Sequence, residues 1–206
     1  MKKTGPKVEL AALRRSLKKL HDHFVRSHLG PPSLQPPTTD EILDVAAYVV
    51  LVHGALENFI ESLALWVVGH SVANWTKEKR TTRCTSSLLL YQAIPNDGGP
   101  IPTVFDNIRL ALDLAKDRVS KTVAENNGIT PVHLRNLFLP LGLNVPSDPV
   151  LTASLELLVR MRHQWAHQYR FGAAIVIRSA QDVQTTVSDC VTLVQRLSAE
   201  AAAMRP

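Results

Sequence analysis

A long apolar stretch, from Val45 to Val68, constrains the fold more than any other feature of the sequence. Four polar residues interrupt this stretch: His53, Glu57, Asn58 and Glu61. A helix that crosses a bilayer is apolar over about 20 residues, with few or no charges. The interruptions therefore favour a helix buried in a protein core over a membrane span. We expect this helix to run from about Asp40 to His70, behind a capping box of Thr38 and Glu41.

The N-terminal segment also shows the apolar spacing of a helix. Its apolar residues recur at intervals of three and four: Leu10, Leu13, Leu17, Leu20 and Phe24. Gly30 and the two prolines after it end the segment, because proline fixes its own φ and has no amide hydrogen. We predict an amphipathic helix within residues 1–30, a proline-rich connector over residues 31–39 and one helical domain over residues 40–206.

Further helices are predicted inside that domain. They are a short one before the loop at residues 95–100, and then helices over residues 103–127, 131–141, 149–170 and 180–203. Ser147-Asp148-Pro149 favours a helix start, because a side-chain cap precedes proline at the first helical position. Residues 171–177 are predicted to be an extended connector. With no internal repeat in the sequence, we predict an all-α fold, a single bundle of about five to seven helices.

Composition narrows the class of protein without identifying its function. The chain has 206 residues, of which 45% are hydrophobic and 20% charged, as in globular proteins with one core. Its two cysteines, Cys84 and Cys190, lie far apart, which fits a reducing cytosol. Charged residues interrupt the segment after Met1, so we expect no export signal and a cytoplasmic protein. The net charge of +5 suits a polyanionic partner, or simply a mildly basic surface.

Arginine and histidine gather in one segment, between Arg160 and Arg170. On an ideal helix Arg160, His163 and His167 lie within about 60° of one another. Arg162 lies about 140° from His167. It therefore needs its long side chain, a distorted helix or a second subunit to share a site with that histidine.

Three interpretations of this segment stay open. His163 and His167 have the spacing of a zinc metalloprotease helix, but Gln164 replaces the glutamate that serves as base, and no third ligand stands out. A polar helix surface without a catalytic role is the second interpretation. The third is RNA cleavage without a metal, because ribose carries its own nucleophile, the 2′-OH. Histidine as a base and arginine as a fixed cation for the phosphate are then sufficient.

The segment resembles a known family of ribonucleases. Arg162 and His167, with the polar His163 directly after the arginine, match the R-x4–6-H motif of HEPN-domain ribonucleases. Residues 50–61 are similar to the long early helix of the RiboL-PSP-type HEPN group, and residues 127–143 to its segment before the motif helix. The resemblance covers roughly residues 40–200.

The resemblance implies a homodimeric helical bundle in which the two motifs meet in a composite cleft. It implies an endoribonuclease that leaves a 2′,3′-cyclic phosphate, needs no metal or other cofactor and is not bound to a membrane. Such proteins occur in toxin–antitoxin and antiphage systems, so an antitoxin or a defence-system protein is an expected partner beside RNA. Arg162 and His167 carry the catalytic roles by position, and His163 stands where many members have asparagine.

Other residues are expected to support this site. Glu57 is expected to pair with Arg162 or Arg160, or else to face solvent. Tyr169 and Arg170 follow the motif and either stack on and clamp RNA or serve only packing and surface charge. A run of basic residues follows the long apolar helix: Lys77, Lys79 and Arg80. It forms either a phosphate-binding rim or a solvated loop.

Two other functions remain as alternatives to the ribonuclease. One is a non-catalytic HEPN module that dimerises and binds nucleotide, RNA or a protein partner. The other is a basic helical DNA-binding protein, although no helix-turn-helix with a basic recognition helix is apparent. The presence of both Arg162 and His167 favours the enzyme.

Overall fold

The computed structural model describes residues 5–30, 36–93, 108–167 and 178–204. All regular structure within these ranges is helical, which confirms the predicted all-α bundle of five to seven helices. The α-helices are α1 (Pro6–Phe24), α2 (Thr39–Glu78), α3 (Arg83–Ala93), α4 (Ile108–Ala124), α5 (Pro131–Phe138), α6 (Pro149–His167) and α7 (Ala180–Ala203). Short 3₁₀ turns follow α1 (η1, Arg26–His28) and α5 (η3, Leu139–Leu141).

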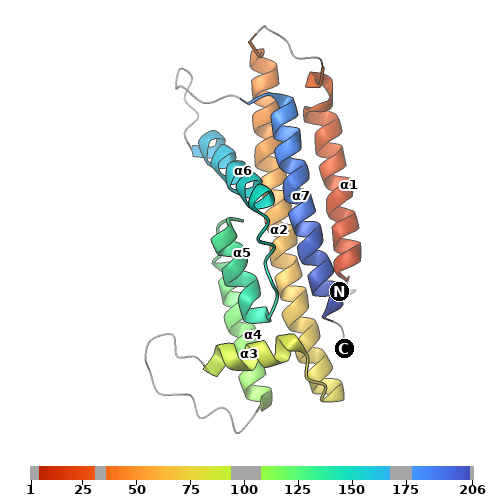
Figure 1. Ribbon diagram of the computed structural model, residues 1–206, viewed down its shortest axis with the longest axis vertical. Coiled ribbons are helices and arrows are strands. Elements are labelled where there is room, and N and C mark those ends of the chain that lie inside the picture. Colours follow the sequence, from red (N-terminus) through yellow and green to blue (C-terminus); the bar gives the residue numbers. More distant parts are fainter. Residues whose placement is uncertain (1–4, 31–35, 94–107, 168–177, 205–206) are drawn as a thin grey trace.

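The longest helix is α2, which runs through most of the height of the molecule (Figure 1). Its start follows the predicted cap, because the Glu41 amide donates to Thr38 Oγ1 at 3.2 Å. It ends at Glu78 rather than near His70, with Lys79 in the left-handed conformation and its N–H bonded to the Trp75 carbonyl. The last turns are largely exposed and polar, so they lack the apolar pattern on which the predicted end was based.

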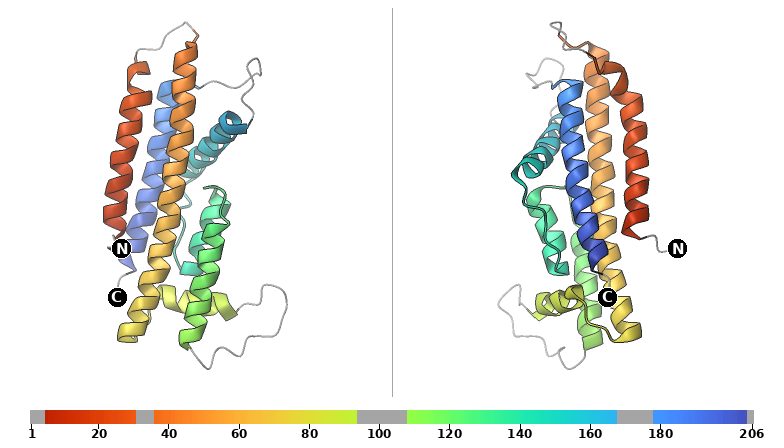
Figure 2. Two further views of the ribbon diagram at one scale, coloured as in Figure 1. Left: turned by 180° about the vertical axis from the view of Figure 1, so that it is seen from behind. Right: turned by 45° about the vertical axis from the view of Figure 1, so that its right-hand side comes forward.

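Helices cover α2 on several sides. α1 and α7 run alongside it, while α4, α5 and α6 pack against it from another direction (Figure 2). The core between them consists mainly of leucine and valine, with Leu56 and Ile60 of α2 completely buried. By length and composition alone α2 also qualifies as a membrane-spanning helix, and 44% of its most apolar window is buried inside the molecule.

Side-chain caps fix the start of the helix that carries the arginine–histidine motif. Asp148 Oδ1 accepts hydrogen bonds from the amides of Val150 and Leu151, at 3.1 and 3.4 Å. The other Asp148 oxygen accepts one from Arg196 of α7 at 3.1 Å, which ties the beginning of α6 to the last helix. The predicted start of α6 at Pro149 is confirmed, as are the bounds of α7.

Some predicted features lie outside the described residues: the start of a helix at Thr103, the end of another at Arg170 and the connector at residues 171–177. The described part of α4 ends at Ala124, a few residues before the predicted end near Asn127-Gly128. The predicted helix over residues 131–141 is divided into α5 and η3, because Pro140 cannot donate the amide hydrogen bond that continues an α-helix.

The buried face of α2 should dominate the stability of the bundle. Leu56→Ala removes a fully buried side chain and should lower the free energy of unfolding by about 2–5 kcal/mol. Leu90→Ala, at a leucine that is 68% exposed, should change it by less than about 1 kcal/mol. Urea unfolding followed by circular dichroism measures both, and equal losses would contradict this packing.

Candidate functional site

A polar hollow of about 510 Å³ lies where α2, α6 and the end of α4 meet. Arg162 reaches it from α6, and Asn126 and Asn127 border it just after α4. The α2 residues that line it are Gly54, Glu57, Asn58 and Glu61. The predicted residues Arg162 and Glu57, which are far apart in the sequence, therefore meet in one accessible site.

The acidic wall of this hollow follows from a four-residue spacing in α2. His53, Glu57 and Glu61 are separated by about one helical turn each, so they share one face of the helix. His53 is only 3% exposed, and its Nδ1 lies 3.8 Å from Glu57 Oε2. Glu61 Oε1 accepts a hydrogen bond from Asn126 Nδ2 at 2.8 Å, which holds the residues after α4 against α2.

Burial and the charge of Arg162 both determine how this face titrates. Burial, with a second contribution from the Arg162 charge, lowers the pKa of His53 to about 4. The imidazole is therefore neutral at pH 7, and its contact with Glu57 is not an ion pair. Burial and then the charge of Glu61 raise the pKa of Glu57, while Arg162 and His133 act in the opposite direction. Each shift favours the uncharged form, and the hollow holds the Arg162 guanidinium together with the carboxyl groups of Glu57 and Glu61.

Two further basic residues of α6 lie outside the hollow. Arg160 and His163 are exposed and do not line the hollow. Arg160 lies two residues before Arg162, or about 200° around the helix. The arginine that acts on Glu57 is thus Arg162, and the structure does not bring Arg160 to it.

His167 is the last residue of α6, so its backbone lies about 7.5 Å further along the helix axis than that of Arg162. The His167 side chain lies outside the described part of the structure, and so do Tyr169 and Arg170. Their predicted roles stay predictions.

The predicted basic rim is not at this hollow. Lys77 belongs to the last turn of α2, about 30 Å along the helix from Glu57. Lys79 Nζ lies 4.5 Å from the centre of the Trp75 ring, and Arg80 Nε lies 3.7 Å from Glu78 Oε2. Lys79 and Arg80 therefore have partners close by, at the C-terminal end of α2 and away from the hollow.

Several residues at the site were not predicted from the sequence. They are His53, Glu61, Asn126, Asn127 and His133. The spacing of His53, Glu57 and Glu61 was a usable signal, because three polar residues one turn apart on an apolar helix must face a polar partner. No comparable signal marked the asparagines, since Asn-Asn-Gly is also an ordinary helix end.

The hollow is equipped to hold an anion beside Arg162. The guanidinium offers several N–H donors, and the amides of Asn58 and Asn127 lie in the same lining. Across the described ranges, no group of three or more His, Cys, Asp or Glu side chains is placed to hold a metal ion. No protein-family model, curated protein or solved structure matches the chain.

The buried His53 should make stability depend on pH. Its pKa of about 4 in the folded protein lies below the ordinary value of 6.5, so the unfolded chain binds the proton more readily. Stability should therefore fall by about 2 kcal/mol between pH 7 and pH 5 through this group. His53→Gln should remove that part of the dependence in urea unfolding at the two pH values. An unchanged dependence in the variant would contradict the assignment.

Replacing Arg162 should change the titration of His53. Arg162→Gln removes a positive charge that lowers the pKa of His53, so that pKa should rise while staying below 6.5 because of burial. Arg160→Gln, two residues away on the opposite side of α6, should leave it unchanged. NMR titration of the imidazole C–H signals measures this, and equal effects of the two variants would contradict the geometry.

Proposed function

We propose that this protein is a metal-independent endoribonuclease, with Arg162 and His167 as its catalytic residues. The observation that carries the proposal is the position of Arg162 in an accessible polar hollow of about 510 Å³, beside Glu57 and two asparagines. An arginine that served only the surface charge of α6 would need no such surroundings. The HEPN-like motif supplies the second catalytic residue, His167.

Arg162 is suited to bind the scissile phosphate. Its guanidinium can bind two phosphate oxygens at once and stays protonated at any physiological pH. Two carboxyl groups lie beside it: Glu57 has a pKa raised mainly by burial, and Glu61 accepts a hydrogen bond from Asn126.

His167 completes the reaction in this proposal. Its imidazole takes the proton from the ribose 2′-OH, and the 2′-oxygen attacks the adjacent phosphorus. The bond from phosphorus to the 5′-oxygen breaks, the leaving oxygen takes up a proton from water, and His167 returns its proton to the solvent. Arg162 stabilises the additional negative charge on the phosphate oxygens. The products are a 2′,3′-cyclic phosphate and a 5′-hydroxyl end.

A second copy of the chain is part of the proposal. Arg162 and His167 lie about 140° apart around α6, so two subunits facing each other would bring an arginine and a histidine together more easily than one. Exposed apolar residues of α2 support this, because a second subunit could cover them. They precede and follow the hollow residues in the sequence: Leu43, Val50, Leu51 and Leu65. We place the dimer in the cytoplasm, as a toxin or antiphage effector with an antitoxin or defence-system partner.

The proposal predicts RNA cleavage in the presence of EDTA. Arg162→Ala should lower the rate by about 10²–10³-fold, because it removes the cation that stabilises the transition state. His167→Ala should lower it by about 10²–10⁴-fold, because it removes the base. End-labelled RNA separated on denaturing gels gives both rates.

Matched controls lie on α1, which packs against α2 (Figure 2) and lines no part of the hollow. Arg15→Ala and His23→Ala change exposed residues of the same two types and should cut RNA like the wild type. A wild type that leaves varied RNAs intact would refute the ribonuclease, and equal cutting by all four variants would refute the catalytic roles of Arg162 and His167. A folded wild type that binds RNA or nucleotide without cutting would instead be the non-catalytic module.

A further inference from the structure

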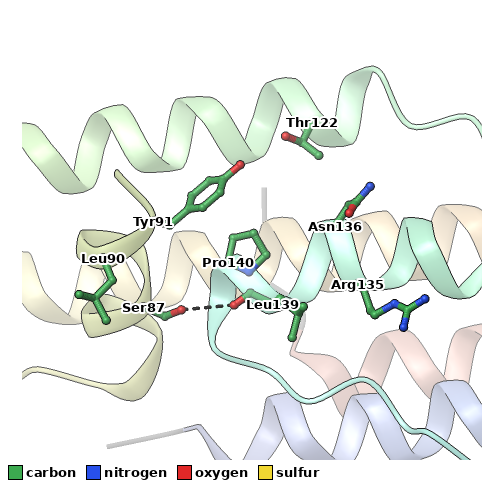
Figure 3. A pocket seen from close by; sticks show the side chains of 8 residues that line it. All are labelled: Ser87, Leu90, Tyr91, Thr122, Arg135, Asn136, Leu139 and Pro140. Carbon is green, nitrogen blue, oxygen red and sulfur yellow. Dashed lines mark hydrogen bonds between the residues drawn. The ribbon is translucent and has the colours of Figure 1, made fainter. Parts of the chain in front are cut away.

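A second pocket, of about 540 Å³, lies among α3, α4, α5 and η3. Figure 3 shows Tyr91 and Arg135 at opposite ends of it, with Leu139 and Pro140 between them. Asn136 and Thr122 border one side of the pocket, and Ser87 and Leu90 lie on α3. The pocket thus combines an aromatic ring, an apolar floor, a cation and an amide.

The polar side chains at the Arg135 end have no partner among the described residues. No hydrogen bond or ion pair joins the Arg135 guanidinium or the Asn136 amide to another residue of the described ranges. Arg135 is exposed, so its charge is available to a ligand from solvent. An unpaired guanidinium at the rim of a pocket selects an anion, and phosphate matches its geometry.

The aromatic end is held in place from α4. Arg118 lies over the Tyr91 ring, 5.3 Å from its centre, and its Nη1 donates to the Tyr91 carbonyl at 3.4 Å. Thr122 uses its hydroxyl hydrogen within α4, in a bond to the Arg118 carbonyl at 3.1 Å. Its oxygen therefore remains an acceptor at the edge of the pocket. A fixed aromatic ring in a pocket of this size is a surface on which a base can stack.

Two helices connect this pocket with the Arg162 hollow. Thr122 of the pocket belongs to the last turn of α4, and Asn126 of the hollow follows it by four residues, just after the helix ends at Ala124. On α5, Asn136 belongs to the pocket, and His133, one turn earlier, acts on the pKa of Glu57. The two sites are therefore neighbours along both helices.

We propose that this second pocket binds a nucleotide of single-stranded RNA, with the base on Tyr91 and a phosphate on Arg135. Placing that nucleotide in the strand cleaved at Arg162 rests on the proposed function. Asn136 would hydrogen-bond the base edge or the sugar, and Leu139 and Pro140 would contact the apolar faces of the nucleotide. Glu156 lines a separate hollow on the other side of Arg135, so the phosphate is expected on the Tyr91 side.

RNA fits these residues better than an acidic peptide does. A carboxylate would use Arg135 alone, whereas a nucleotide uses the ring, the amide and the guanidinium together. The proximity of Arg162 adds a second phosphate-binding arginine within reach of the same strand. An acidic peptide is accordingly treated as a competing outcome of the experiment.

Binding of a fluorescent RNA with 2′-O-methyl riboses tests the pocket, because this RNA lacks the nucleophile and cannot be cut. Tyr91→Ala should weaken binding by about 5- to 150-fold, while Tyr91→Phe, which keeps the ring, should bind like the wild type. Arg135→Ala should reduce the slope of log affinity against log salt by about 0.7, and Arg135→Lys should restore it.

The outcomes separate this proposal from the ribonuclease. If the Tyr91→Ala and Arg135→Ala variants bind like the wild type, or if the wild type does not bind, the pocket assignment is overturned. Competition by polyglutamate as strong as by unlabelled RNA would also overturn it, in favour of an acidic peptide. The protein could bind RNA through Tyr91 and still leave unmodified RNA uncut. That result would support the pocket and contradict the ribonuclease. Arg15→Ala serves as the charge control.

Discussion

The structure depends on the need to cover α2. This helix is 40 residues long and carries apolar side chains on most sides. No single neighbouring helix can bury them all. α1 and α7 cover one part of its circumference, and α4, α5 and α6 cover another. The ends of α4 and α6 thereby reach the same stretch of α2, although they are distant in the sequence. The candidate site is a consequence of that convergence.

Where α4 and α6 meet α2, the α2 side chains are polar, and these polar side chains form the candidate site. Burying His53 and Glu57 is costly unless each loses its charge or gains a partner, and both effects occur here. The pKa of His53 falls and that of Glu57 rises through burial, while the positive charge of Arg162 lowers the pKa of both. The result is a guanidinium with fixed surroundings that still faces an accessible hollow. An anion that enters this hollow meets an oriented cation, as phosphate chemistry requires.

The fold was largely predictable from the sequence, and the site only in part. Apolar spacing and caps are local, so the start of α6 at Pro149 and the bounds of α7 could be predicted from neighbouring residues. The end of α2 could not, because its last turns extend beyond the apolar pattern. Glu57 was predicted to pair with Arg162 or Arg160 or to face solvent, but the positions of Asn126 and His133 depend on how α4 and α5 pack against α2. The pocket at Tyr91 and Arg135 is likewise assembled from distant segments.

The central claim is that Arg162 and His167 act on a phosphate attacked by the neighbouring 2′-hydroxyl. The most direct test uses an RNA cut by this protein in EDTA, with a single 2′-deoxyribose placed on the 5′ side of the mapped bond. The account predicts that cleavage at this bond stops while other bonds are still cut, and that the normal products carry 2′,3′-cyclic phosphate ends. Undiminished cleavage at the deoxy position would contradict it, because the attacking oxygen would then have to come from elsewhere.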